Sequence, residues 1–186
     1  MTTALNFQLY GINYTLRIGP DWDPNRCKSP TRVASDLQQL QSIAQNVRIF
    51  SLNDCDAGNA VLTAAAALPN MGVWLGLWVG PNGHNFDAER TVLLQLLSDE
   101  QSHDWSRVRG IHVSSEAIYR GDLTVQQAVA YRNIIKADLV ANGWPDIPVV
   151  VADIASLYSC CIGVVFSYFA ILTPQRHPDL SVLLLD

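Results

Sequence analysis

Five short apolar runs recur along the chain, and helix-length segments separate them. The runs are rich in β-branched residues and are continuously apolar rather than alternating, which is typical of parallel strands covered on both faces. They predict buried strands at Phe7–Asn13, Val47–Leu52, Val73–Val79, Val108–Val113 and Ile147–Ala152.

The intervening segments carry helix signals. Ser29 and Pro30 precede an apolar stripe with helical spacing, and Thr124 with Gln127 forms a capping box for a helix that runs to Asn142. Two further helices are expected over residues 57–67 and 85–98. The predicted order is therefore βαβαβαβαβ, an α/β protein with a parallel sheet.

Two architectures accept this order, a doubly wound sheet and a (β/α)8 TIM barrel. No GxGxxG follows the first strand and no GxxxxGK[ST] occurs, so the nucleotide-binding form of the open sheet lacks its phosphate loop. A full barrel takes about 250 residues. A barrel would therefore be incomplete here, with about five strands and four helices over residues 5–153. Residues 154–186 do not follow the pattern and form an atypical C-terminal tail.

Composition and charge indicate which classes of binding partner the protein can have. Among 186 residues, 49% are hydrophobic and 16% are charged, which indicates a globular protein. The net charge is −5 and no basic run is present, so nucleic-acid binding is not favoured. The longest nearly uncharged apolar stretch, 160–172, is shorter than the roughly 20 residues of a membrane span. The N-terminus shows no signal peptide, so the protein stays inside the cell or the sequence begins after its signal.

The four cysteines and four histidines show no metal-ligand spacing, so neither a metal nor another cofactor is expected. Cys27 and Cys55 each follow a predicted strand, in loops that could be neighbours. They would form a disulfide in an exported protein and remain two thiols in a reducing cytosol.

Candidate chemistry gathers where predicted strands end, because parallel α/β folds carry their active residues there. Of the three glutamates, only Glu116 lies directly at a strand end. It could be a general acid, or it could simply pair with Arg120 or Arg109. Arg48 falls inside a predicted strand and needs a partner, either an active-site carboxylate or a structural one.

Three aromatic residues at strand ends, Tyr14, Trp78 and Tyr119, could stack against sugar rings, although each could equally be part of the core. A serine hydrolase is a weaker alternative, suggested by His112, Ser114 and Ser115. The GxSxG elbow is absent, and strand alternation predicts that His112 and Ser115 point to opposite faces.

Six segments together resemble a known family: LYGINYTLR, CKSPTRVASDLQQL, NVRIFSLNDC, VWLGLWV, GIHVSSEAIYRGDLT and IPVVVADI. Over residues 7–153 the chain resembles the N-terminal portion of glycoside hydrolase family 17, in its fungal and oomycete branch of cell-wall β-1,3-glucanases and glucanosyltransferases. The resemblance implies a TIM barrel in which Glu116 is the acid/base and Ser115 helps to bind the sugar. Ser114 stands where the family usually has glycine.

The resemblance also implies a retaining reaction on β-1,3-glucan by hydrolysis or transglucosylation, outside the cell or in its wall. Such a reaction needs a second carboxylate about 5–5.5 Å from the first. In the family that residue comes from a late strand, and no glutamate follows Glu116 here. The alternative is therefore a truncated, inactive remnant that at most binds β-glucan. Oligomerisation is expected only if it covers the open barrel edge.

Overall fold

The computed structural model describes residues 8–99 and 102–153, so the predicted tail at 154–186 lies outside the described residues. Five strands form one parallel sheet: β1 (Leu9–Asn13), β2 (Ala44–Arg48), β3 (Gly72–Leu77), β4 (Val108–Ser115) and β5 (Val149–Ala152). Their order in the sheet is their order in the sequence. A doubly wound sheet reverses its strand order, whereas a barrel wall does not. The expected incomplete (β/α)8 barrel is thus confirmed as a half-barrel.

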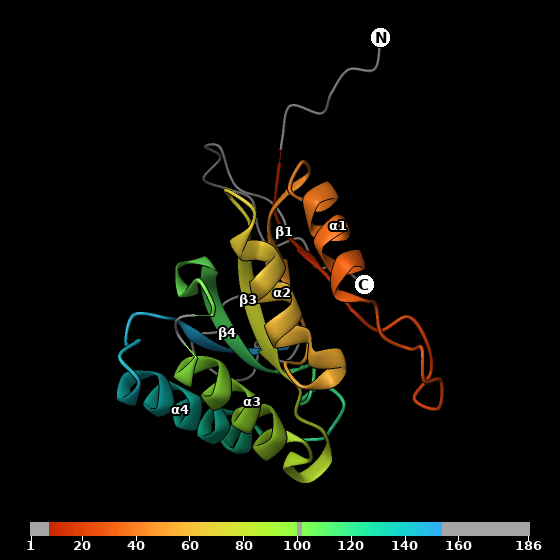
Figure 1. Ribbon diagram of the computed structural model, residues 1–186. Coiled ribbons are helices and arrows are strands. Elements are labelled where there is room, and N and C mark those ends of the chain that lie inside the picture. The colour runs from red at the N-terminus through yellow and green to blue at the C-terminus, as the bar shows by residue number, and fades with distance from the viewer. Residues whose placement is uncertain (1–7, 100–101, 154–186) are drawn as a thin grey trace, which may run out of the picture.

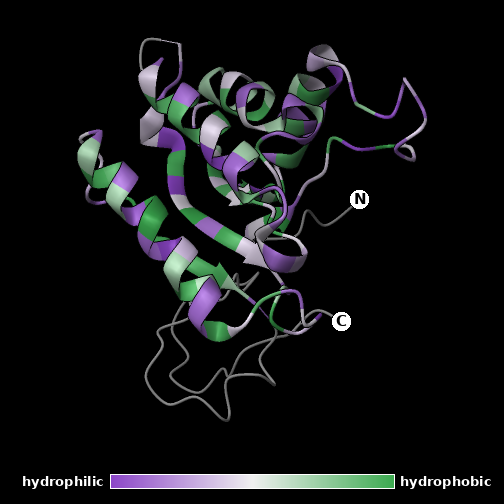
Figure 2. Ribbon diagram, turned by 90° about the horizontal axis from the view of Figure 1, so that it is seen from below, coloured by the Kyte–Doolittle hydropathy of each residue, from purple (hydrophilic) through white to green (hydrophobic). Residues whose placement is uncertain are grey.

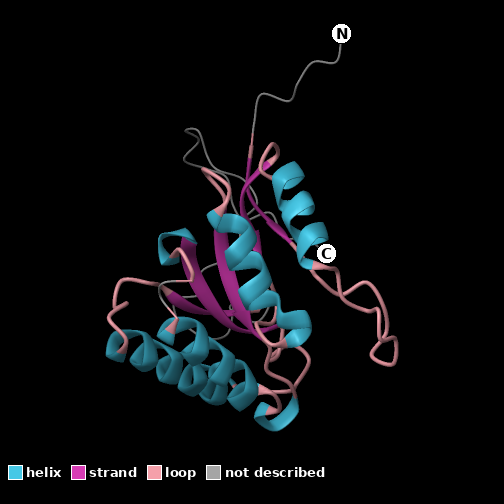
Figure 3. Ribbon diagram, in the orientation of Figure 1, coloured by secondary structure: helices cyan, strands magenta, loops and turns pink. Residues whose placement is uncertain are grey.

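Four helices follow the first four strands: α1 (Pro30–Leu40), α2 (Ala57–Ala66), α3 (Phe86–Ser98) and α4 (Val125–Ala141). Parallel crossovers are right-handed, so strands added always in one direction keep their helices on one face. Figures 1 and 3 show this arrangement, with the helices on the outer side of a curved sheet. Figure 2 shows the same curvature from below. No helix among the described residues is long and apolar enough to cross a membrane.

The predicted helix starts are confirmed. The Ser29 hydroxyl accepts a hydrogen bond from the Arg32 backbone N–H at 3.2 Å. Thr124 and Gln127 form the full reciprocal capping box at the start of α4. These contacts satisfy backbone donors that have no partner inside the helix.

The core lies between the helices and the sheet. Its fully buried side chains come from every layer and include Leu37 of α1, Leu62 of α2, Leu93 of α3, Ile111 of β4 and Ile135 of α4. Burial of these side chains fixes the sheet, and with it the positions at which the strands end.

The second predicted strand was placed too late. It was expected at Val47–Leu52, but β2 begins at Ala44 and ends at Arg48. Polar Gln45 and Asn46 hid its start, although Asn46 is buried and its side-chain amide donates to the Tyr10 carbonyl. The chain then enters a loop, so Arg48 stands at the carboxyl end of its strand and not in its middle.

Candidate functional site

Arg48 connects three strand ends. Its Nη2 donates to the Ser115 hydroxyl at 3.2 Å, and its Nη1 lies 3.5 Å from the side-chain oxygen of Asn13. These residues end β2, β4 and β1 respectively. Burial lowers the pKa of Arg48 to about 10, while the negative charge of Glu116 raises it. The guanidinium therefore stays protonated at neutral pH and presents a positive charge beside Glu116.

Glu116 follows a bend in the chain. Ser114 and Glu116 both have left-handed backbone conformations, with φ of 64° and 57°, and the register of β4 against β5 shifts between Val113 and Ser115. The Glu116 backbone N–H donates to the Ala152 carbonyl at 3.0 Å. The side chain of Glu116 is exposed. A fixed backbone therefore presents this carboxylate to solvent at the carboxyl edge of the sheet.

Asp153, just after β5, holds the turn that follows Glu116. Its carboxylate accepts hydrogen bonds from the backbone N–H groups of Ile118 at 2.8 Å and Tyr119 at 3.3 Å. The Arg120 N–H donates to the Glu116 carbonyl at 2.9 Å. The end of β5 thus positions the segment that carries Glu116.

The bend corrects one prediction. His112 and Ser115 were expected on opposite faces, yet both contact Arg48 Nη2, His112 through Nδ1 at 3.4 Å and Ser115 through Oγ at 3.2 Å. Alternation fails because the left-handed Ser114 adds an irregular step to β4. The two ring nitrogens of His112 lie near backbone carbonyl oxygens, those of Ser114 and Ile49, rather than near a serine hydroxyl, and a neutral ring donates to one of them.

Arg120 and Arg109, the two predicted ion-pair partners of Glu116, form hydrogen bonds with other residues. Arg120 donates to Asp122 at 2.8 Å and to the Ser115 carbonyl, and Arg109 donates to the Ser106 carbonyl at 2.9 Å. The Arg120 guanidinium also lies 4.8 Å from the ring centre of Trp78. Among the described residues, the ion pairs of Arg120 thus go to Asp122, and the charge of Glu116 acts on the pKa of Arg48.

The three aromatic candidates differ in exposure. Tyr119 is 60% exposed, and Trp78 is partly buried beneath Arg120. Tyr14 is only 6% exposed, and its hydroxyl donates to Asp36 at 3.0 Å. Burial and this contact raise the pKa of Tyr14. Tyr14 thus belongs to the packing of α1 against the sheet, whereas the exposed Tyr119 and the partly buried Trp78 stay predicted substrate contacts.

A family model for the BtgE/BtgC glycoside hydrolase domain matches residues 11–162. The chain belongs to this family. The match extends past Asp153 into the region set apart as a tail. The expected likeness to glycoside hydrolase family 17 is confirmed by the crystal structure of a β-1,3-glucanosyltransferase of that family from Rhizomucor miehei. The two share 32% identity with a TM-score of 0.65, over 78% of this chain and 49% of the other. An active-site mutant of that enzyme, in complex with laminaritriose, matches equally well.

Curated relatives include a glucan 1,3-β-glucosidase of Saccharomyces cerevisiae, 33% identical over 54% of this chain and 31% of the relative. A glucan endo-1,3-β-glucosidase, btgC, of Emericella nidulans is 29% identical over 61% of this chain and 16% of the relative. The chain therefore spans less than a third of the length of these members of the family.

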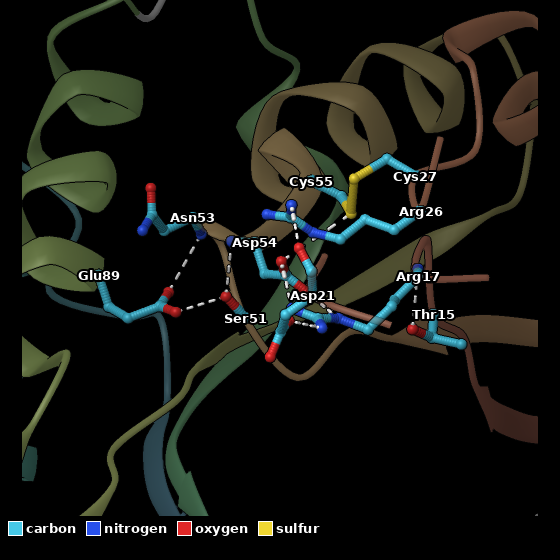
Figure 4. A network of polar contacts seen from close by, with 10 residues as sticks. All are labelled: Thr15, Arg17, Asp21, Arg26, Cys27, Ser51, Asn53, Asp54, Cys55 and Glu89. Carbon is cyan, nitrogen blue, oxygen red and sulfur yellow. Dashed lines mark hydrogen bonds and ion pairs between the residues drawn. A yellow bond between two sulfur atoms is a disulfide. The ribbon is translucent and has the colours of Figure 1, made fainter. Parts of the chain in front are cut away.

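Sequence reasoning missed the role of Glu89 in this BtgE/BtgC domain. Its carboxylate, 2% exposed, accepts hydrogen bonds from the backbone N–H groups of Leu52 at 2.7 Å and Asn53 at 3.2 Å, and from the Ser51 hydroxyl. Burial raises the pKa of Glu89. The surface-charge pattern of a helix gave no sign of this contact, which clamps the loop after β2 (Figure 4).

The loops after β1 and β2 are joined at two points. Cys27 and Cys55 form a disulfide with a Cα–Cα distance of 5.4 Å. The Arg17 guanidinium makes two hydrogen bonds of 2.9 Å to the Asp54 carboxylate. Figure 4 shows both contacts side by side. The described residues contain no cluster of three or more histidine, cysteine or acidic residues able to hold a metal ion.

Proposed function

We propose that this domain acts on β-1,3-glucan as a glycoside hydrolase or transglucosylase, with Glu116 as the acid/base. The observation that carries the proposal is the exposed Glu116 carboxylate at the carboxyl end of β4, beside the Arg48 guanidinium. Family membership and the printed activities of the relatives support the substrate class.

Glu116 in its protonated form donates a proton to the glycosidic oxygen as the bond to the leaving sugar breaks. The carboxylate then takes a proton from the water or sugar hydroxyl that attacks the intermediate. In a retaining reaction a second carboxylate, about 5–5.5 Å away, forms the glycosyl-enzyme. We assign that role to no described residue.

Substrate contacts are proposed for Ser115, Arg48, Trp78 and Tyr119. The Ser115 hydroxyl and the Arg48 guanidinium can hydrogen-bond sugar hydroxyls next to Glu116, and the exposed Tyr119 ring offers an apolar face for a sugar ring. The buried Tyr14 is left out of this set, because its ring is covered.

An extracellular or cell-wall location is proposed as well. The Cys27–Cys55 disulfide supports it, because disulfides persist in oxidising compartments and are rare in the cytosol.

The test is to incubate the protein with laminari-oligosaccharides of defined length and to identify products by mass spectrometry. Shorter oligosaccharides with new reducing ends indicate hydrolysis, and longer ones indicate transfer. Both must disappear in Glu116→Gln and persist in Asp146→Asn, a matched change at an exposed position between α4 and β5. Binding without any product would instead support the glucan-binding remnant.

A further inference from the structure

His112 bridges two strands below the candidate site. It lies on β4 with 1% of its surface exposed, and its ring extends across β3 toward β2. Nδ1 lies 2.8 Å from the Ser114 carbonyl oxygen, and Nε2 lies 2.9 Å from the Ile49 carbonyl oxygen. Gly76 of β3 leaves room for the ring, because a Cβ there would stand 2.4 Å from Nε2. A neutral imidazole carries one N–H, so in the Nδ1–H tautomer the ring donates to the Ser114 carbonyl of the bend and packs beside the Ile49 carbonyl that follows β2.

The bend at Ser114 is strained. A residue other than glycine with φ of 64° costs on the order of 1–3 kcal/mol, and such a conformation persists only where its surroundings hold it. The buried Ser114 hydroxyl finds no hydrogen-bond partner among the described residues. The Ser114 side chain therefore does not stabilise its own conformation. The contact of its carbonyl with the His112 ring can do so directly, beside the Glu116 N–H bond to the Ala152 carbonyl that follows the bend.

The conformation of Ser114 decides the direction of the next two residues. In a regular strand, Ser115 would point away from the face that His112 shares with Arg48. With the bend, the Ser115 hydroxyl meets Arg48 at 3.2 Å, and Glu116 follows in its own left-handed conformation.

We infer that His112, in its Nδ1–H tautomer, is a positioning residue for Glu116, which it directs by donating to the Ser114 carbonyl and so holding the left-handed bend. Its effect on turnover rests on the proposed function. Its effect on the bend does not. A glycine at position 114 adopts this φ without strain, so it makes the bend independent of His112. His112 and Ser114 are therefore coupled.

The experiment compares His112→Met with His112→Gln, each alone and together with Ser114→Gly. Met and Gln have side chains of equal length, but only Gln keeps an N–H that can donate to a carbonyl. On laminari-oligosaccharides, His112→Met should lower kcat about ten- to hundredfold with little change in KM, as expected for a misplaced acid/base. His112→Gln should lower kcat less than His112→Met does. Adding Ser114→Gly to His112→Met should raise its kcat about tenfold or more.

Equal losses in His112→Met and His112→Gln would overturn the inference. So would a Ser114→Gly change that raises kcat of the wild type and of His112→Met by the same factor. Urea unfolding of the same proteins separates this inference from the proposed function, because it needs no turnover. If Ser114→Gly stabilises His112→Met more than it stabilises the wild type, the coupling holds even where no protein turns over glucan. Additive effects on unfolding would refute it.

Discussion

Arg48 and Ser115 are 67 positions apart in the sequence, and the Arg48 guanidinium donates to the Ser115 hydroxyl at 3.2 Å. The bond joins the carboxyl ends of β2 and β4 across the intervening β3. It places a permanent positive charge beside the residue that follows Ser115, which is Glu116.

Replacing Arg48 by lysine should impair turnover while the charge is kept. A lysine ammonium is a point donor and cannot contact Asn13 and Ser115 together as the forked guanidinium does. Loss of a charge-assisted hydrogen bond is worth about 1.5–3 kcal/mol, so kcat/KM on laminari-oligosaccharides should fall about ten- to hundredfold. Arg32→Lys, an exposed change on α1, is the matched control. Unchanged kcat/KM in Arg48→Lys would show that the geometry of the guanidinium is irrelevant.

The Cys27–Cys55 disulfide should stabilise the fold measurably. It closes a loop with a sequence separation of 28, for which the chain-entropy relation gives about 3–4 kcal/mol. The double variant Cys27→Ser with Cys55→Ser should lose that much free energy of unfolding in urea. The pair Cys160→Ser with Cys161→Ser, which leaves this disulfide intact, serves as control. Equal stabilities of the wild type and the Cys27/Cys55 variant would contradict the prediction.

His112 should make the protein less stable in mild acid. Burial first, and then the charge of Arg48, lower its pKa from 6.5 to about 3. As the pH falls below about 6.5, the unfolded chain binds a proton at His112 and the folded chain does not. This stability is therefore complete above pH 6.5 and is lost toward pH 3, at up to about 1.4 kcal/mol per pH unit.

The measurement is urea unfolding of the wild type and His112→Gln at pH 7, 5.5 and 4. The carboxylates titrate in both proteins, so the difference between the two curves isolates His112. The wild type should lose more stability than the variant as the pH falls. Parallel curves would mean that the folded and unfolded states bind this proton equally well.

Glu89→Gln should damage stability, because the carboxylate accepts from three donors in the loop after β2. The amide of glutamine places a donor where only acceptors fit, at a cost of about 1–3 kcal/mol. Glu116→Gln, at an exposed site, should leave the unfolding midpoint in urea nearly unchanged. A Glu89→Gln protein as stable as the wild type would show that the clamp contributes nothing to folding.

Sequence reasoning found what local pattern encodes. The continuously apolar runs predicted the parallel strands, and the Thr124–Gln127 capping box predicted the start of α4. The position of Glu116 at the end of a predicted strand made it the candidate acid/base. The start of β2 was missed because its pairing with β1 buries the polar Asn46. The meeting of Ser115 with Arg48 was missed because it depends on the left-handed Ser114, where the sequence shows no glycine to mark a bend. The clamp by Glu89 depends on contacts between distant segments, which no local periodicity reports.

The central claim is that Glu116 donates the proton to the leaving group, and two substrates test it directly. In a laminari-oligosaccharide the leaving group is a sugar alkoxide, which needs the proton to depart. In a dinitrophenyl glycoside of the same sugar the leaving group is dinitrophenolate, which departs without a proton. Glu116→Gln should lose about 10²–10⁴-fold in rate on the oligosaccharide and far less on the dinitrophenyl glycoside. Equal losses on both substrates, or full activity on the oligosaccharide, would contradict the assignment of Glu116 as the acid/base.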